Sequence, residues 1–237
     1  MFLSIVIAAY NEEENVEELT NRIYASLTPL DIPFELIYVI DGSDRSCELL
    51  QKMRTTKDTM HLDCSPLPRG FKNAFVQGFN MVNKKATHIL TLDADLNHRP
   101  EEIGLFIRAM EESNADIVIG SRYMVGGQIM NLGILKRMVS LIANIITEII
   151  FKLRIKDKTS GFRLYKKEAL MRIVPSCTSQ GFEFLFEILL VAKNMHYSLK
   201  EVPILFETRE RGRSKFRLVR TSKGYCALVW KYWLHFS

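Results

Sequence analysis

Short apolar runs alternate with stretches of helical periodicity through the first half of the chain. The apolar runs are rich in β-branched and aromatic residues, and we predict strands at 2–9, 34–40, 60–63, 88–92 and 116–120. The stretches between them repeat their apolar residues at helical spacing, which predicts helices at 12–27, 46–54, 72–84 and 100–113. This alternation indicates βαβ units and a mainly parallel sheet flanked by helices. The predicted fold class is therefore α/β.

The alternation weakens after Gly120, where we expect long helical and irregular stretches. The most apolar of these is Ile134–Leu153, but charged and polar residues interrupt it, so it fails as a transmembrane span. Its apolar residues recur at helical spacing, which is typical of an amphipathic helix. Such a helix can lie in a membrane interface or pack on the domain core, and the sequence leaves both readings open.

Length and cysteine content narrow the class of protein. The chain has 237 residues, of which 47% are hydrophobic, and this suits one large domain better than two small ones. The four cysteines lie far apart, at positions 47, 64, 177 and 226, without a metal-like spacing. We interpret them as reduced thiols in a reducing compartment and predict no disulfide. Because the chain starts directly with strand-like sequence, we do not expect a secretory leader.

Charge is distributed unevenly around a formal net value of +5. From Lys193 onward there are ten Lys and Arg residues against three Glu. A basic segment with aromatic residues suits phosphate groups, nucleic acid or an anionic membrane surface, and by itself it does not choose among them. Trp230, Tyr232 and Trp233 beside Lys231 are typical of aromatic side chains at a membrane interface.

An acidic turn, Asp93-Ala94-Asp95-Leu96-Asn97, directly follows the predicted strand 88–92. In parallel sheets ligands bind beyond the carboxyl ends of the strands, where this turn falls. Two carboxylates and an amide oxygen at alternate positions can converge on Mg²⁺ or Mn²⁺. The turn can equally be a solvated cap for the helix at 100–113. His98 beside it either approaches a metal or phosphate or makes hydrogen bonds within the turn.

Several motifs in order resemble one known family. Residues 7–13 (IAAYNEE), 39–43 (VIDGS) and 93–95 (DAD) resemble the N-terminal motifs of family-2 glycosyltransferases. Residues 120–123 (GSRY), 159–163 (TSGFR), 181–184 (GFEF), 201–204 (EVPI) and 209–215 (RERGRSK) resemble the polyprenyl-phosphate glycosyltransferases, which include the dolichol-phosphate mannose synthases. The resemblance covers about residues 2–217. It implies a GT-A fold, a single nucleotide-binding domain, with amphipathic interface helices toward the C-terminal half.

The resemblance also implies a role for each matching residue. The nucleotide contacts fall on Ala8, Tyr10, Glu12, Val39, Asp41 and Ala94, and the metal ligands on Asp93, Asp95 and Asn97. Arg122, Arg209 and Lys215 are expected to contact phosphates, and Arg137 is a further candidate for the lipid phosphate. Asp95 and Arg122 are the predicted catalytic residues. For Arg137 the alternative is an ordinary surface ion pair.

Four positions depart from the family pattern. Ala8 and Arg99 stand where Pro is usual, Asn97 stands where Gln is usual, and Ile40 replaces the first Asp of an Asp-Asp-Gly-Ser run. The change at Ile40 removes one contact to the nucleotide base, so the base is left open. The shorter side chain of Asn97 leaves the third metal ligand unsettled.

The implied reaction moves a sugar from a nucleotide-diphospho-sugar, GDP-mannose or a UDP-sugar, to a polyprenyl phosphate with inversion. A divalent Mg²⁺ or Mn²⁺ would offset charge on the diphosphate leaving group. The acceptor phosphate is already anionic, so cations rather than a general base are needed. The alternative is transfer to a saccharide hydroxyl, for which Glu183 is the candidate carboxylate. Glu183 and Glu187 also share one helical face and can be structural.

The domain prediction is a GT-A unit at 1–217 with an inserted interface helix at 134–153, followed by a basic, aromatic, membrane-proximal tail at 218–237. The expected partners are the nucleotide sugar, a polyprenyl phosphate and a membrane surface, without nucleic acid. The expected location is the cytoplasmic face of a membrane, either peripheral or with a C-terminal anchor. A membrane-anchoring partner protein is also consistent with this pattern.

Overall fold

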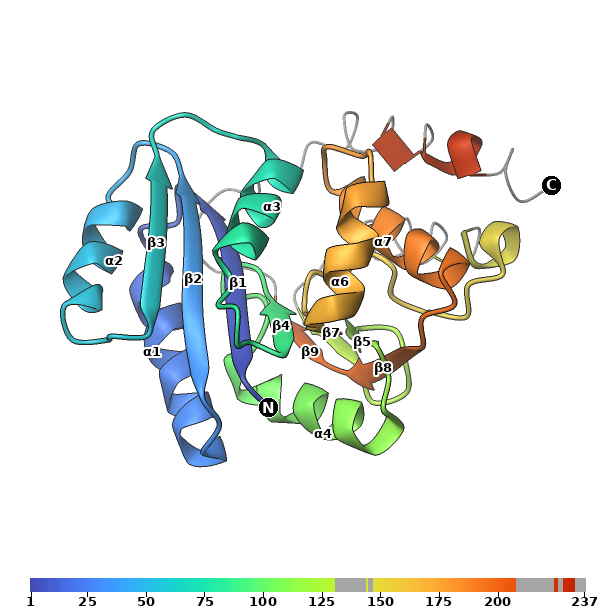
Figure 1. Cartoon of the computed structure of the whole chain (residues 1–237), viewed down its shortest axis with the longest axis horizontal. Helices are drawn as coiled ribbons and strands as arrows, with labels where there is room; N and C mark the ends of the chain where they lie inside the picture. Colours follow the sequence, from blue (N-terminus) through green and yellow to red (C-terminus); the bar gives the residue numbers. More distant parts are fainter. Residues whose placement is uncertain (131–143, 145–146, 208–223, 226–227, 233–237) are drawn as a thin grey trace.

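A computed structural model describes residues 1–130, 144, 147–207, 224–225 and 228–232. A seven-stranded sheet runs through the molecule, with helices on both of its faces (Figure 1). Its strands are β1 (Leu3–Tyr10), β2 (Phe34–Asp41), β3 (Met60–Ser65), β4 (His88–Thr91), β5 (Ile117–Ser121), β7 (Arg163–Lys166) and β8 (Leu199–Pro203). A separate two-stranded sheet pairs β6 (Gln128–Met130) with β9 (Leu205–Glu207).

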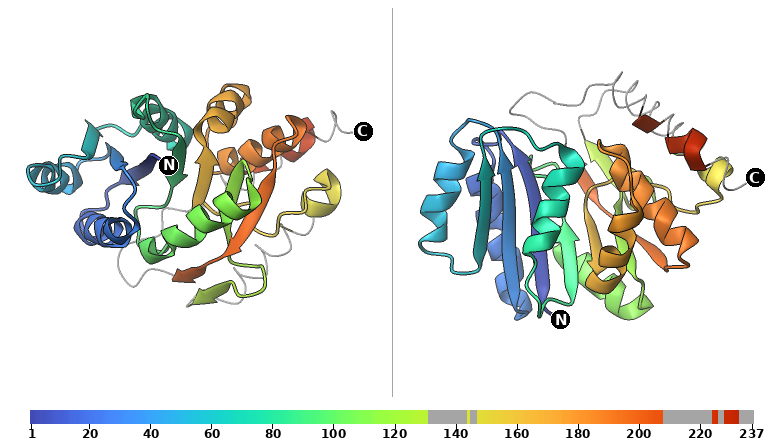
Figure 2. Two further views of the ribbon diagram at one scale, coloured as in Figure 1. Left: turned by 60° about the horizontal axis from the view of Figure 1, so that its bottom comes forward. Right: turned by 45° about the horizontal axis from the view of Figure 1, so that its top comes forward.

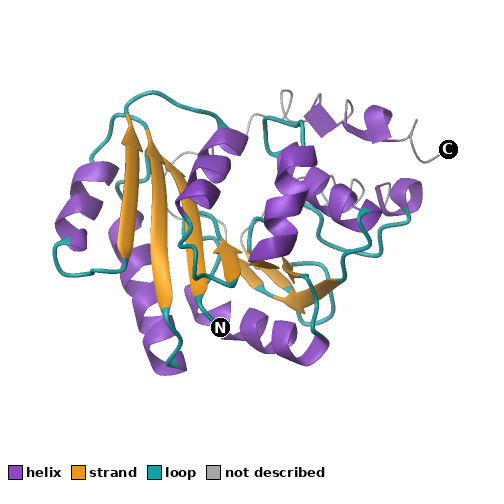
Figure 3. Ribbon diagram, viewed as in Figure 1, coloured by secondary structure: helices purple, strands orange, loops and turns teal. Residues whose placement is uncertain are grey.

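The helices follow the strands closely. The α-helices are α1 (Val16–Leu27), α2 (Ser46–Arg54), α3 (Phe71–Met81), α4 (Ile103–Ser113), α6 (Lys167–Ile173) and α7 (Glu183–Asn194). Three short 3₁₀ turns are η1 (Thr28–Leu30), η2 (Pro100–Glu102) and η3 (Val174–Ser176). Colouring by secondary structure shows the strands as a twisted fan between these helices (Figure 3).

The strand order explains where a ligand can bind. The order is β3-β2-β1-β4-β7-β5-β8, and every pair is parallel except those made by β7. The chain moves outward from β1 to β2 and β3, and then returns through α3 to β4 on the other side of β1. Such a reversal opens a crevice beyond the carboxyl ends of the two central strands. Those ends carry Tyr10 and the acidic turn.

Two hydrophobic clusters pack on opposite faces of the sheet. Alternate residues of β1 point to opposite sides, so Ile5 and Ile7 join the cluster with α1 and α4, whereas Val6 joins the cluster with α3 and α7. Figure 2 shows α1 and α4 on one side of the strands and α3 and α6 on the other. Burial on both faces explains why the central strands read as nearly continuous apolar runs.

The predicted elements of the first half are confirmed with small shifts at their ends. The second half differs, because β7 and β8 extend the main sheet where we expected helical and irregular stretches. β7 is antiparallel and enters between β4 and β5. It contains only four residues and has Arg163 and Lys166 at its ends, so its own sequence carries a weak strand signal. Its pairing with two buried strands decides its conformation.

The described end of the apolar stretch 134–153 packs on the core. Residues 147–151 are helical, with Phe151 buried against Phe186 and Ile149 exposed. Most of this stretch and Arg137 lie outside the described residues. No helix in the described part of the chain is long and apolar enough to cross a membrane.

The tail is only partly described, at 224–225 and 228–232. Tyr232 is buried, and its hydroxyl donates to the Glu187 carboxylate, 3.2 Å away. The prediction of an interfacial role for Tyr232 is therefore wrong, because this side chain is used to dock the tail on α7. Trp230 is exposed, so its predicted interfacial role stays a prediction. Trp233 lies outside the described residues.

The prediction of reduced thiols is wrong for two of the four cysteines. Cys47 and Cys64 form a disulfide across a sequence separation of 17. Cys47 lies in the first turn of α2 and Cys64 lies near the end of β3, and in a βαβ unit both positions fall at the carboxyl edge of the sheet. Spacing along the chain does not reveal this proximity. Cys177 is buried and free.

Reduction of this disulfide should weaken the fold measurably. Closing a loop of this size typically stabilises a protein by about 2–4 kcal/mol through the entropy of the unfolded chain. We expect the free energy of unfolding, measured by urea titration, to fall by that amount when dithiothreitol is added, and the urea midpoint to fall with it. A Cys47→Ser/Cys64→Ser double variant should unfold at the same urea concentration with and without reductant. Equal midpoints for the oxidised and reduced wild-type protein would contradict the prediction.

Candidate active site

The acidic turn lies directly beyond β4, at the predicted edge of the sheet. The Asp93 side chain is about one-third exposed, and Asp95 is partly buried. Asn97 donates from its backbone nitrogen and from Nδ2 to the two carboxylate oxygens of Asp95, at 3.2 and 2.9 Å. The remaining polar atom, Asn97 Oδ1, is buried and accepts no hydrogen bond within the described part of the chain. A buried carbonyl oxygen without a donor is a suitable metal ligand.

These three side chains fit a hard divalent cation. Two carboxylates and an amide oxygen are the donor set that Mg²⁺ and Mn²⁺ prefer, and such ions retain open positions for phosphate oxygens. Within the described residues no cluster of three His, Cys, Asp or Glu side chains forms an alternative centre. A cation held by Asp93, Asp95 and Asn97 would supply electrostatic stabilisation to a leaving diphosphate.

His98 points away from solvent, behind the turn. It is 1% exposed, and its Nδ1 accepts a hydrogen bond from the Asp93 backbone nitrogen at 3.2 Å. The same nitrogen is 3.5 Å from an Asp93 carboxylate oxygen, a pair that would be ionic only with a protonated ring. Burial lowers the pKa of His98 to about 4, so the ring is neutral at neutral pH. The hydrogen bond is therefore the relevant contact, and His98 belongs to the turn's own hydrogen bonding.

The buried neutral state of His98 makes stability depend on pH. In the unfolded chain this ring titrates near 6.5, whereas in the folded protein its pKa is about 4. Between these values the unfolded state binds a proton that the folded state does not, so stability is full above pH 6.5 and falls toward pH 4. The expected loss is about 2 kcal/mol at pH 5 and about 3 kcal/mol near pH 4. Urea unfolding at pH 7.5, 6 and 5 measures it.

The control for this pH effect is His98→Asn, which replaces the ring by a side chain that does not titrate. His88 is also half-buried and its pKa is lowered by burial, so it contributes with the same sign to both proteins and cancels in the comparison. The wild-type protein should lose more stability on acidification than the variant. Parallel curves for the two proteins would refute the assignment.

A second cluster lies at the ends of β2 and β3. Arg69 donates from Nε and from its backbone nitrogen to the two carboxylate oxygens of Asp41, at 2.8 and 2.7 Å. Its Nη1 donates to Asp63 at 2.9 Å, and Gln77 donates to the same Asp63 oxygen. The hydrogen bond from Arg69 is the main reason that the pKa of Asp63 is lowered. Arg69 thus fixes Asp41 at the edge where the sequence predicts a nucleotide.

The loop after β1 is held against the loop after β2. Asn11 has a left-handed backbone, and its Oδ1 accepts from the backbone nitrogens of Ser43 and Asp44. Gly42 has φ +119°, and a Cβ there would lie 2.0 Å from Asn11 Oδ1, so only glycine fits. Glu12 is buried and accepts from Asn15 at 2.7 Å. Glu12 thus lies in the turn before α1, where its carbonyl accepts from the backbone nitrogens of Asn15 and Val16.

Arg122 is held by a buried carboxylate. Its Nε and Nη2 donate to the two oxygens of Asp157 at 2.6 and 2.8 Å, and Nη2 also donates to Thr159 at 2.7 Å. Asp157 is fully buried. Burial opposes ionisation of both groups, but their attraction raises the pKa of Arg122 and lowers that of Asp157. This bidentate pair gives Asp157 the role of holding Arg122 in place.

The loop 157–161 lies against the acidic turn. Thr91 donates from its hydroxyl to the Gly161 carbonyl at 2.7 Å. A Cβ at Gly161 would lie 2.7 Å from Asp93 Oδ1, so glycine lets the loop approach the carboxylate. The charge of Asp93 also contributes to the raised pKa of Arg122. The predicted metal site and the predicted phosphate-binding arginine are therefore neighbours, although 29 positions separate Asp93 from Arg122 in the chain.

The two glutamates of α7 have structural partners. Glu187 is fully buried and accepts from the backbone nitrogens of Thr178 and Ser179 and from Lys231. Glu183 accepts from the Gly181 backbone nitrogen at 2.9 Å, at the start of the helix. The structural reading of these residues is confirmed for Glu187.

The remaining predicted residues are distributed as follows. Tyr10 ends β1 and is exposed, Ala8 is partly buried, and Ala94 is buried within the acidic turn. Val39 is fully buried and packs against Gly78 of α3. Arg137, Arg209 and Lys215 lie outside the described residues.

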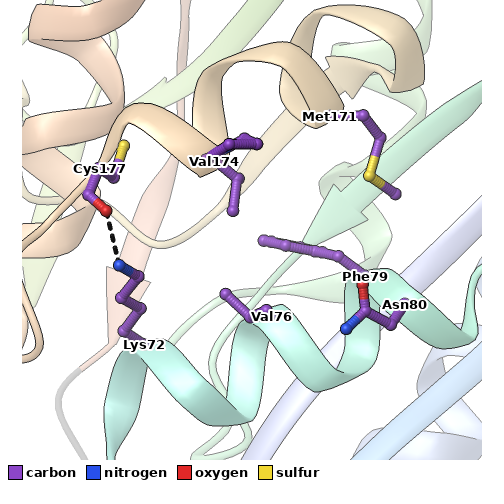
Figure 4. Close-up of a pocket in the computed structure, with 8 residues that line it drawn as sticks. Lys72, Val76, Phe79, Asn80, Met171, Val174 and Cys177 are labelled. Atoms are coloured by element: carbon purple, nitrogen blue, oxygen red, sulfur yellow. Dashed lines mark hydrogen bonds between the residues drawn. The ribbon is translucent and has the colours of Figure 1, made fainter.

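A pocket of about 400 Å³ lies elsewhere, between α3 and α6. Figure 4 shows the apolar side chains that line it, with Lys72 at one end donating to the Cys177 carbonyl at 2.6 Å. None of the predicted site residues lines this pocket. The candidate site is therefore the polar edge of the sheet and not the cavity.

Two functional residues were not found from the sequence. Arg69 is the only basic residue in the loop 66–70 between β3 and α3, and a lone cation at the ligand edge was the available signal. Phe206 in β9 forms an isolated bridge with His98, and Glu207 donates from its backbone nitrogen to the Asn97 carbonyl at 3.2 Å. No local pattern indicates this contact.

The chain is similar to a known protein family and to two named proteins. Residues 4–174 match the family Glycosyl transferase family 2. The chain is 35% identical to a dolichol-phosphate mannosyltransferase of Pyrococcus furiosus over 92% of its own length and 60% of that protein. It is 31% identical to a polyprenol monophosphomannose synthase of Mycolicibacterium smegmatis over 89% of its own length and 79% of that protein. The chain thus spans about 60% of the first relative and about four-fifths of the second.

Solved structures support the fold. A glucosyl-3-phosphoglycerate synthase from Mycobacterium tuberculosis, crystallised with Mn²⁺ and UDP, superposes with a TM-score of 0.67 at 16% identity, covering 94% of this chain and 75% of that one. The mannosyltransferase PcManGT from Pyrobaculum calidifontis, in complex with GDP-Man and Mn²⁺, gives a TM-score of 0.58 at 14% identity, covering 89% and 58%. These likenesses confirm the GT-A fold. With the family match and the two relatives, they establish that the chain belongs to glycosyl transferase family 2.

Proposed function

We propose that the chain transfers a sugar from a nucleotide-diphospho-sugar to a polyprenyl phosphate, with inversion at the anomeric carbon. The observation that carries the proposal is the juxtaposition of two sites of opposite charge. An oxygen-rich turn suited to a divalent cation lies beside a partly buried arginine that is suited to phosphate.

The donor half consists of the acidic turn and the cluster around Asp41. Asp93, Asp95 and Asn97 would hold Mg²⁺ or Mn²⁺, and the ion would supply positive charge to stabilise the leaving diphosphate. Asp41, fixed by Arg69, supplies carboxylate oxygens for hydrogen bonds from the nucleoside. Arg209 and Lys215 belong to the same half as cations for the diphosphate. This assignment uses the resemblance of the motif at 209–215.

The acceptor half is the Arg122 loop. Asp157 engages Nε and Nη2 of Arg122, and no described residue accepts from its Nη1, which is left for a phosphate oxygen. A phosphate nucleophile is already ionised near neutral pH, so no general base has to be present. Glu183, the candidate base for a hydroxyl acceptor, instead accepts a backbone hydrogen bond at the start of α7. This favours phosphate over a saccharide hydroxyl.

The named relatives support the same acceptor and suggest the sugar. One is a dolichol-phosphate mannosyltransferase and the other a polyprenol monophosphomannose synthase. A mannosyl donor is therefore the first to test, with GDP-mannose ahead of UDP-sugars.

The lipid acceptor implies work at a membrane surface. Ile149 and Trp230 are large apolar side chains that the fold leaves exposed, on helical segments that both pack on the α7 side of the sheet. Their exposure supports peripheral contact of this side with the cytoplasmic face of a membrane. A membrane-anchoring partner or a C-terminal anchor would add to this contact.

The test is a transfer assay with purified protein, Mn²⁺ or Mg²⁺, a panel of nucleotide sugars, and either a short polyprenyl phosphate or free saccharides as acceptor. Formation of a metal-dependent glycolipid with inverted configuration is the expected result. EDTA should abolish it. Transfer to saccharides only would refute the proposal and favour the alternative acceptor.

A further inference from the structure

His98 contacts three segments whose relative positions must stay fixed for the proposed reaction. It follows the acidic turn, and its Nδ1 accepts the Asp93 backbone N–H at 3.2 Å. That hydrogen bond uses the ring nitrogen nearest to the carboxylates. The imidazole is buried behind the turn, so its lone pair stabilises the backbone of the turn and is not available to a cation.

The faces and edges of the same ring contact two other segments. The Phe162 ring lies 5.2 Å from it in a tilted arrangement, and Phe162 directly follows Gly161 in the loop that carries the partners of Arg122. The Phe206 ring lies 5.6 Å away, edge to face. Aromatic pairs in this distance range contribute specific orientation beyond simple burial.

Backbone contacts reinforce the connection to β9. His98 and Phe206 form an antiparallel bridge, and the Leu205 backbone nitrogen donates to Glu102 at 2.9 Å. Residue 209, the first cation of the motif at 209–215, follows two positions after β9.

We propose that His98 is a positioning residue: its Nδ1 holds the acidic turn in the conformation that receives the cation, and its ring holds the acceptor loop and β9 against that turn. It neither ligates the cation nor transfers a proton. The kinetic consequences of this positioning role rest on the proposed function. The effect of His98 on cation binding does not, because it can be measured without a lipid substrate.

Three substitutions separate the two tasks of the ring. Asparagine and leucine have nearly the same shape, but only asparagine places an acceptor atom near the position of Nδ1. Phenylalanine keeps a ring of similar size without the acceptor. The protein variants are His98→Asn, His98→Leu and His98→Phe, each checked for folding by circular dichroism and thermal unfolding. His88→Phe is the matched control, because His88 lies at the opposite end of β4 from the acidic turn.

The first measurement is Mn²⁺ affinity, by electron paramagnetic resonance titration with GDP or UDP present. Residues that orient metal ligands typically change affinity about 10–100-fold when replaced. We expect His98→Leu and His98→Phe to bind Mn²⁺ at least about 10-fold more weakly than wild type, and His98→Asn and His88→Phe to remain within about threefold. Wild-type affinity in His98→Leu or His98→Phe would overturn the role of Nδ1, as would equal losses in His98→Asn and His98→Leu.

The second measurement is steady-state transfer to polyprenyl phosphate. Loss of the ring in His98→Asn should raise KM for the acceptor about 10-fold while kcat changes less, and His98→Phe should retain the wild-type KM. An unchanged KM in His98→Asn would overturn the role of the ring. If the wild-type protein binds Mn²⁺ but makes no glycolipid, the proposed function fails, and the Mn²⁺ titration alone decides the inference. If one variant does not fold, the other two still test the role of Nδ1.

Discussion

Asp95→Ala will reduce metal-dependent transfer by about 1,000-fold, equivalent to about 4 kcal/mol of transition-state stabilisation. Asp95 contributes one of two carboxylates in the acidic turn, and it also accepts both hydrogen bonds from Asn97. Its removal would take away one proposed metal ligand and release the Asn97 side chain, which is the proposed third ligand. Because the charge to be neutralised develops on the leaving diphosphate, the loss should appear mainly in kcat.

The measurement compares initial rates for wild type and Asp95→Ala over a range of Mn²⁺ concentrations. Asp58→Ala is the control, since Asp58 is an exposed carboxylate just before β3, at the other end of the sheet. That variant should retain the wild-type rate and Mn²⁺ dependence. A rate within about 10-fold of wild type for Asp95→Ala at saturating Mn²⁺ would show that the turn does not hold the catalytic cation.

The second large effect is expected from Asp157→Asn. Asp157 is fully buried, and its carboxylate receives both the Arg122 guanidinium and the backbone nitrogens of Thr159 and Ser160. Removing one charge of a buried pair leaves the other uncompensated, which typically costs about 3–5 kcal/mol. We therefore expect the free energy of unfolding to fall by about that amount.

We expect activity to fall as well as stability, because the Arg122 guanidinium loses the carboxylate that orients it. We expect the KM for the polyprenyl phosphate to rise, when it is measured at a temperature where the variant is fully folded. Glu168→Gln is the control for stability, since Glu168 forms a solvent-exposed ion pair with Arg172 within α6. Exposed pairs contribute about 0–1 kcal/mol. A comparable loss of stability for Glu168→Gln and Asp157→Asn would contradict the special role of the buried pair.

The disulfide and the buried histidine show two different limits of prediction from sequence. Cys47 and Cys64 are unremarkable by spacing, and they meet only because α2 starts, and β3 ends, at the same edge of the sheet. The sequence left open whether His98 approaches a ligand or makes hydrogen bonds within the turn, and the partners of its ring, Phe162 and Phe206, follow it by 64 and 108 positions. No window of neighbouring residues contains such contacts.

The local pattern of the first half of the chain was enough to predict β1 to β5 and the helices between them. Each of these elements has a clear apolar period, and parallel strands buried on both faces leave few alternatives. The acidic turn was predicted for the same reason, since it follows a buried strand immediately. Its metal-binding role required the ordered motifs of the family, because Asp-rich turns also cap helices.

The sequence by itself thus determined the α/β class, the edge of the sheet where a ligand is expected, the family and the residues of the acidic turn. Only the tertiary structure decided that Arg69 holds Asp41 and that Asp157 holds Arg122, pairs separated by 28 and 35 positions. It also placed β7 between β4 and β5. The physical reason is that hydrophobic periodicity is a property of neighbouring residues, whereas a binding site consists of side chains that strand register and loop packing bring together.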